Sequence, residues 1–263
     1  MKALNVLQIS DLHVLATPGA TMLGVDTEYY FHRTLAHAFA SHHAFDLILL
    51  TGDLTQEPTA ASYQRIANHL AGYQTPCLCL PGNHDDFALM QEHLRNDWVS
   101  CDKQIALGNW RVLLLNSQIE NNPAGKLAEN ELAWLETMLQ NRADPFFLVA
   151  VHHHAYPSGC AWLDGMGIEN GKALCQQLAR HGNVKALING HIHQALAKRY
   201  QHIDLLAAPS TCFQFAPDSA NFRIDDASPG YRVLELFDDG SLNTACYRLP
   251  ETLKGLDLDN RGY

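Results

Sequence analysis

The residues best suited to chemistry in this 263-residue chain are aspartate, asparagine and histidine side chains gathered in five short clusters. Each cluster follows directly after a short apolar run. The clusters are DLH at 11–13, GD at 52–53, GNHD at 82–85, HHH at 152–154 and GHIH at 190–193. Carboxylate, amide and imidazole groups without thiolates suit zinc, manganese or iron ions. The five clusters therefore predict a metal site.

Seven side chains in these clusters are candidate metal ligands. They are Asp11, His13, Asp53, Asn83, His152, His191 and His193. Seven protein ligands exceed what one tetrahedral zinc ion takes, so two ions fit better. An aspartate reaching both ions would hold them about 3.5 to 4 Å apart, the spacing typical of two-metal phosphoester hydrolysis. We predict two divalent or mixed-valence ions, and the ligand types do not choose among Fe, Mn and Zn.

The three consecutive histidines leave a choice open. Neighbouring residues at a strand end point in alternating directions, so only one or two of His152, His153 and His154 can face the ions. We predict that His152 is the ligand. Asp53, Asn83 and His191 each follow a glycine, whose missing Cβ lets the backbone come close to the ions.

A simpler interpretation exists for each cluster taken alone. Asn and Asp beside Gly are ordinary turn formers, and an Asp-x-His triplet arises by chance. Five such clusters at successive strand ends are hard to explain as turns. The joint pattern therefore favours a metal centre.

The elements that must position these clusters are buried strands. Short apolar runs occupy 4–9, 47–50, 77–80, 112–115, 146–151 and 184–188. Between most of them apolar residues recur at helical spacing, as at Leu132, Leu135 and Leu139. Alternating strands and helices indicate an α/β fold, in which the strand ends converge on one crevice.

After residue 196 the pattern changes to strand-like runs alone, at 203–208, 231–237 and 242–247. We expect these runs to form a second, more antiparallel sheet. The chain has no internal repeat and no linker rich in Gly, Ser or Pro. One domain spanning 1–263 is the expected organisation.

Charge and cysteine content limit the partners and the compartment. The formal charge is −10 and no basic stripe is visible, so we do not expect the protein to bind nucleic acid. Seven cysteines without a framework of spacings indicate reduced thiols and a cytoplasmic protein. No signal peptide or membrane span is visible, so no membrane partner is expected. The pattern leaves the oligomeric state open, a homodimer included.

The set of D-x-H, GD, GNHD, paired histidines and GHxH resembles the calcineurin-like metallophosphoesterase superfamily. Further segments are similar to the bacterial class III 3',5'-cyclic AMP phosphodiesterases: LGVDT at 23–27, HHHAYPSGCAWLD at 152–164, PSTCFQF at 209–215 and PGYRVLEL at 229–236. The resemblance covers nearly the whole chain. One departure is Ala155, where the family often has proline.

This resemblance implies an α/β fold, a four-layer α/β/β/α sandwich of two mixed sheets. It also implies how the ligands divide between the ions. Asp11, His13 and His193 would hold one metal, Asn83, His152 and His191 would hold the other, and Asp53 would bridge them.

The resemblance further implies hydrolysis of 3',5'-cyclic AMP to 5'-AMP, with a metal-bridging hydroxide as nucleophile. His84 would be the catalytic group beside the phosphate, together with Asp53. The substrate would be bound by His13, Asn83, His84 and His193. A phosphodiesterase or phosphatase acting on another ester, such as a glycerophosphodiester or another cyclic nucleotide, is the alternative. A scaffold protein without activity is disfavoured, because every ligand position is filled.

Three aromatic residues bear on how a nucleotide base would bind. Phe213, Phe215 and Trp162 lie in loops that follow the metal clusters. They could stack on a base, but aromatic residues in an α/β protein more often belong to the core. The sequence leaves both interpretations open.

Overall fold

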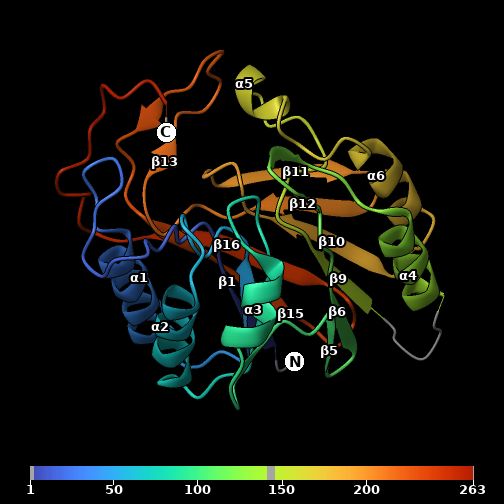
Figure 1. Ribbon diagram of the computed structural model, residues 1–263. Helices are drawn as coiled ribbons and strands as arrows, with labels where there is room; N and C mark the ends of the chain where they lie inside the picture. The colour runs from blue at the N-terminus through green and yellow to red at the C-terminus, as the bar shows by residue number, and fades with distance from the viewer. Residues whose placement is uncertain (1–2, 141–145, 263) are drawn as a thin grey trace.

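The computed structural model describes residues 3–140 and 146–262. Two six-stranded sheets face each other, and helices cover their outer faces (Figure 1). The first sheet has the spatial order β16 (Leu242–Arg248), β15 (Gly230–Leu236), β1 (Leu4–Ile9), β2 (Leu47–Thr51), β3 (Cys77–Leu80) and β4 (Val99–Ser100). The second has the order β11 (Leu196–Tyr200), β12 (Ile203–Ala207), β10 (Val184–Asn189), β9 (Phe146–Ala150), β6 (Trp110–Leu114) and β5 (Gln104–Leu107).

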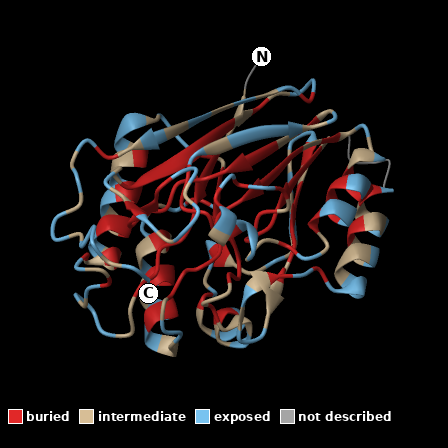
Figure 2. Cartoon of the chain, turned by 90° about the horizontal axis from the view of Figure 1, so that it is seen from above, coloured by how far each residue is buried: buried red, intermediate tan, exposed pale blue. Residues whose placement is uncertain are grey.

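Three apolar clusters separate four layers. Helices α1 (Thr27–Ser41), α2 (Ala60–Ala71) and α3 (Phe87–His93) pack on the first sheet through a cluster that includes Phe31 and Ile66. Helices α4 (Glu129–Leu139) and α6 (Gly171–Ala179) pack on the second sheet through Leu135 and Leu174. A third cluster lies between the sheets, and Figure 2 shows these strands buried while the helices expose their outer faces. The predicted α/β/β/α sandwich is confirmed.

The central strands and the helices follow from local sequence. Every residue of β2 and β3 is buried, as expected of parallel strands covered on both faces. Helix α2 begins after Thr59, whose hydroxyl accepts from the Ser62 backbone in a reciprocal capping box. The observed central strands lie within two residues of the predicted runs.

The strands after residue 196 are arranged differently from the prediction. A separate antiparallel sheet was expected there, and this expectation is wrong. Strand β12 pairs in parallel with β10 in the second sheet, whereas β15 pairs antiparallel with β1 in the first. Six of the seven residues of β15 are buried, so this strand fits inside the sandwich, next to the edge strand β16. Strand pairing depends on contacts between distant residues, which a run of apolar letters does not reveal.

Several short elements lie at the rim of the sandwich. They are the β7 (Gln118–Ile119) and β8 (Asn122–Gly125) hairpin, α5 (Ala161–Asp164), and the pair β13 (Gln214–Phe215) and β14 (Ile224–Asp225). Parallel strands β1, β2 and β3 of the first sheet and β9 and β10 of the second all end at this rim, where the predicted clusters follow. Among the described helices, none is both long and apolar enough to cross a membrane.

Candidate metal centre

Backbone hydrogen bonds join the loops that carry the predicted ligands. In the first sheet, the Asp11 N–H donates to the Gly52 carbonyl over 3.0 Å, and the His13 N–H donates to the Asp53 carbonyl over 3.0 Å. In the second sheet, the Gly190 N–H donates to the His152 carbonyl over 3.1 Å. Each sheet therefore presents its ligand loops as one connected unit.

The first group of candidate ligands contains Asp11, His13 and His193, whose ligand atoms lie within 4.8 Å of one another. All three side chains are buried. His193 Nε2 lies 3.5 Å from Asp11 Oδ1 and 3.2 Å from His13 Nε2. The structure thus brings together three residues that are up to 182 positions apart in the chain.

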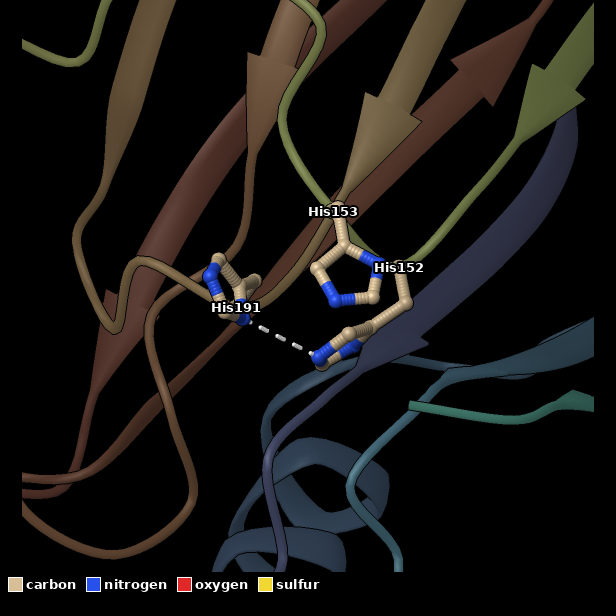
Figure 3. Close-up of side chains that lie close together, drawn as sticks. All are labelled: His152, His153 and His191. Atoms are coloured by element: carbon tan, nitrogen blue, oxygen red, sulfur yellow. Dashed lines mark hydrogen bonds between the residues drawn. The ribbon is translucent and has the colours of Figure 1, made fainter. Parts of the chain in front are cut away.

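The second group lies beside the first. Figure 3 shows His152 and His191 pointing toward each other, with His191 Nδ1 3.3 Å from His152 Nε2. Asn83 Oδ1 lies 3.2 Å from the same His152 Nε2. Asp53 stands between the two groups, because its Oδ2 is 3.3 Å from His152 Nε2 and 3.8 Å from His13 Nε2. All seven predicted ligands therefore belong to one cluster.

The run of three histidines divides as follows. His152 faces the cluster. His153 is buried, with Nδ1 2.8 Å from Ser117 Oγ, and its ring also lies near His191 (Figure 3). His154 Nε2 lies 3.5 Å from Asp164 Oδ1 at the edge of a different hollow. The ligand atoms of His152, His153 and His191 lie within 4.8 Å of one another, so His152 as the metal ligand stays a prediction.

Hydrogen bonds set the orientation of the imidazole rings. His152 Nδ1 lies 2.8 Å from the Thr51 carbonyl oxygen, and His193 Nδ1 lies 2.8 Å from the Phe213 carbonyl oxygen. A carbonyl oxygen only accepts, so Nδ1 carries a proton in both rings and Nε2 is the nitrogen that points to the cluster. This is the orientation that a metal-binding histidine requires.

The same geometry tests whether metal ions fit. The Nε2 atoms of His13 and His193 lie 3.2 Å apart, inside a cluster shielded from water. The buried Nε2 of His191 has no hydrogen-bond partner among the described residues. Nitrogen lone pairs that face one another repel unless a cation lies between them. The residues present therefore fit bound cations with oxygen and nitrogen ligands.

Unusual backbone conformations recur at the candidate ligands. Five of the seven have φ between 47° and 68°: Asp11, His13, Asp53, His191 and His193. This left-handed region costs free energy for residues with a Cβ, and such residues gather at functional sites. The fold holds these side chains in a strained arrangement that serves the cluster.

Two glycines show how tightly the loops approach. A Cβ at Gly82 would overlap the side chain of Asp53, and a Cβ at Gly190 would overlap the side chains of Ser10 and Asp11. The expectation that glycines permit close approach is confirmed at both positions. Gly82 precedes Asn83 and Gly190 precedes His191, so the glycines lie inside the candidate centre.

Asp85 joins two of the ligand loops, a role that the sequence did not reveal. Its carboxylate accepts from the backbone N–H groups of Leu54 and Thr55 in the β2–α2 loop, each over 3.1 Å. It also accepts from the Gly82 N–H over 2.9 Å and from the Tyr63 hydroxyl over 3.0 Å. Burial raises the pKa of Asp85 to about 6, although the backbone donors favour its ionised form. Asp85 therefore positions both loops without facing the cluster.

The protonation states of the cluster follow from burial and charge. Burial alone raises the pKa of Asp53, but the neighbouring His152 and His84 outweigh it and hold that pKa well below 3.8. Burial lowers the pKa of His13 to about 3. Burial also lowers the pKa of His152, yet Asp53 and Asp11 raise it to about 9. A carboxylate and a neutral imidazole are ready for metal, while His152 must lose a proton first.

The remaining predicted site residue, His84, borders the cluster and a cavity. Its backbone N–H donates to Asp53 Oδ1 over 3.0 Å, and its ring centre lies 5.2 Å from that of His13. Its side chain lines a cavity together with Asp53, Asn83 and His191. His84 is therefore placed beside the candidate ligands, as expected.

The three aromatic residues have different surroundings. Phe213 is fully buried, and its ring stacks at 5.8 Å on His13, so it packs against the cluster and cannot meet a base. Phe215 is almost fully buried and stacks at 4.3 Å on His193. Trp162 is only partly buried and lines the cavity. The sequence left open whether these residues stack on a base or belong to the core, and Phe213 belongs to the core.

Comparisons with known proteins extend this picture. A sequence model of the calcineurin-like phosphoesterase family matches residues 4–195. The chain is 41% identical to the 3',5'-cyclic adenosine monophosphate phosphodiesterase CpdA of Escherichia coli K12, over 98% of this chain and 94% of that protein. It is 37% identical to the protein of the same name from Pseudomonas aeruginosa, with the same coverage of 98% and 94%.

A solved structure agrees on the fold. The dimetal phosphatase from Danio rerio superposes with a TM-score of 0.70 at 13% sequence identity, covering 98% of this chain and 100% of that one. At this identity the likeness concerns the fold alone. It supports the two-sheet arrangement described above.

Proposed function

The chain belongs to the calcineurin-like phosphoesterase family, and on that premise we propose that it hydrolyses 3',5'-cyclic AMP to 5'-AMP. One observation carries the proposal: a chain similar to cyclic AMP phosphodiesterases along nearly its whole length gathers all seven candidate ligands in one cluster, six of them buried. The cluster lies at one end of a cavity of about 400 Å³. A phosphate ester can therefore reach the ligands from solvent.

The proposed centre holds two metal ions. Asp11, His13 and His193 would hold one ion and Asn83, His152 and His191 the other. Asp53 would bridge them, since its Oδ2 approaches both groups. Fe, Mn and Zn all suit these ligands. When bound, the ions would supply a nucleophile at neutral pH and neutralise charge on the phosphate.

The chain's own groups would orient the substrate and handle the proton of the leaving group. His84 lines the cavity beside Asp53, so its imidazole N–H could donate to a phosphate oxygen or protonate the departing 3' oxygen. The buried carboxylates of Asp11 and Asp53 leave a small positive excess once two divalent ions are bound. Such an excess favours an anionic ester.

The role of His84 can be tested with one variant and one control. His84→Ala should lower kcat by about 100-fold or more, because general acid catalysis and charge stabilisation contribute on that scale. The metal content should stay at the wild-type value. His43→Ala, an exposed histidine outside the cluster, should change neither. Loss of metal from His84→Ala would contradict its assignment as a group that does not bind metal.

The substrate is tested with purified, metal-analysed protein to which Mn or Fe is restored. We expect 3',5'-cyclic AMP to have a higher kcat/KM than 2',3'-cyclic AMP, a glycerophosphodiester, an aryl phosphodiester or an aryl monoester, and to yield 5'-AMP. A much higher kcat/KM for another ester would replace the named substrate and favour the alternative of a different phosphodiesterase or phosphatase.

The cellular setting is part of the same proposal. All seven cysteines are free thiols and the net charge is −10. These features support a reducing compartment and a small diffusible substrate in preference to nucleic acid. We propose that the enzyme acts in the cytoplasm.

A further inference from the structure

The cavity beside the candidate metal centre changes in character along its length. Its inner end is formed by Asp53, Asn83, His84 and His191. Among the described residues that line it, Asp53 has the only side-chain carboxylate, and the described lining away from the cluster is apolar or carries neutral amides. Its volume of about 400 Å³ lies within the range of small-molecule sites. The cavity thus has one charged end and one neutral, largely apolar part.

Trp162 of α5 is the principal aromatic residue of the apolar part. Its Nε1–H donates to Ser219 Oγ over 3.2 Å. The rings of Phe215 and Phe222 meet it edge to face, with centres at 4.9 Å and 5.3 Å. Figure 1 shows α5 beside the loop between β13 and β14, which contributes Ser219 and Phe222. The indole is therefore held in place before any ligand arrives, which reduces the entropy lost on binding.

A second part of the lining comes from the β7–β8 hairpin. Asn121 and Asn122 line the cavity at the turn. Asn122 Oδ1 accepts from the Ala124 N–H over 2.9 Å, so that oxygen is already used. Asn121 is exposed and has a left-handed φ of 56°, which fits its place in the turn. Side-chain amides of this kind can hydrogen-bond to the edge of a base.

We propose that this cavity binds the base of a nucleotide ester, with Trp162 and Phe222 as its aromatic wall. The inference rests on the proposed function, since it places the phosphate at the His84 end. An anionic phosphate would meet the proposed cations and His84 at one end of the cavity, and a neutral planar ring would meet the apolar lining at the other. A glycerophosphodiester carries no apolar ring and would leave this aromatic wall uncovered.

The test compares two substrates that share the reacting phosphodiester: 3',5'-cyclic AMP and the ribose 3',5'-cyclic phosphate that lacks the base. Trp162→Ala should lower kcat/KM for 3',5'-cyclic AMP by about 10- to 100-fold, the usual scale of base stacking on an aromatic side chain. It should leave kcat/KM for the abasic substrate unchanged. Trp98→Ala, a partly exposed tryptophan that does not line this cavity, is the matched control and should affect neither.

Further variants guard against a folding defect. Trp162→Phe keeps an aromatic ring and should show a smaller loss, again confined to 3',5'-cyclic AMP. Phe222→Ala should act in the same direction as Trp162→Ala. Metal content and thermal midpoint are measured for each variant, so that a loss of folded protein is recognised.

The outcomes separate the two proposals. Wild-type protein that hydrolyses neither substrate would refute the proposed function and this inference with it. Wild-type protein that hydrolyses both at the same kcat/KM would refute the base site alone. An equal loss on both substrates in Trp162→Phe would also refute it, while the phosphodiesterase activity would stand.

Discussion

The layer between the two sheets has two parts that are equally buried and chemically opposite. In the strand interiors, Val6, Leu49, Val112 and Leu148 form an apolar cluster. At the carboxyl ends of the strands lie the buried polar side chains of the candidate centre. Shielding from water stabilises the first part and imposes a desolvation cost on the second. Burial alone therefore does not tell core from site; the chemistry of the buried groups does.

The polar part is held by directional contacts between the sheets. Gln8 of β1 donates to the Asn189 carbonyl of β10 over 3.0 Å, and His152 Nδ1 lies 2.8 Å from the Thr51 carbonyl of β2. Arg232 of β15 donates to the Ala207 carbonyl of β12 over 2.8 Å. These bonds fix the sheets relative to each other where both contribute candidate ligands. The apolar part needs no such bonds, because dispersion and burial are not directional.

Of the variants predicted here, Asp53→Ala should impair the candidate metal centre most. We expect kcat/KM to fall by at least about 1000-fold, because the proposed bridging ligand would support several kcal/mol of charge stabilisation. Wild-type protein should also gain thermal stability on adding Mn, and the variant should lose most of this gain. Thermal melts with and without Mn, together with the hydrolysis assay, measure both effects. Full activity in the variant would remove Asp53 from the centre.

Leu148→Ala tests the apolar part. We expect the free energy of unfolding to fall by about 2 to 5 kcal/mol, because the side chain is fully buried between the sheets. The kcat of the protein that remains folded should match wild type. Denaturant unfolding gives the first quantity, and Leu258→Ala, half exposed at the surface, is the control with little expected change. A large loss of kcat in folded Leu148→Ala would mean that the two parts are coupled.

Asp85→Asn tests the hydrogen bonds by which Asp85 joins two ligand loops behind the candidate centre. The amide would present N–H donors to a pocket already filled with N–H donors, so the two ligand loops should loosen. We expect metal affinity or kcat to fall by about 10- to 100-fold, the scale of outer contacts to metal ligands. Asp97→Asn, an exposed acid, is the matched control. Unchanged metal affinity and kcat would show that Asp85 does not position the loops.

The pH dependence of metal binding tests the protonation state of His152. In the metal-free protein the pKa of His152 is raised from 6.5 to about 9. Its contribution to stability is therefore fully present below pH 6.5 and is lost as pH rises through 9. A cation must displace this proton, so metal affinity should rise with pH over the same window, by at most about tenfold per pH unit. The thermal shift caused by Mn should grow from pH 6.5 to 8.5. A constant shift would argue against a proton on His152.

Much of the candidate centre could be predicted because each cluster is local. Asp11 and Asp53 each come two residues after the end of an apolar strand, and parallel strands bring such positions to one rim. The supporting contacts could not be predicted in this way. Gln56, whose Oε1 lies 2.7 Å from His13 Nδ1, belongs to no motif. The same is true of Gln118, which donates to the carbonyls of Gly82 and Asp85.

The sequence by itself determined which side chains can bind metal, because ligand chemistry belongs to the residue type and strand ends are encoded locally. Only the tertiary structure decided that β15 joins the first sheet, that Phe213 is core, and that Trp162 borders the cavity. These outcomes depend on contacts between residues far apart in the chain. Their free energies arise from packing, which no local pattern of residues specifies.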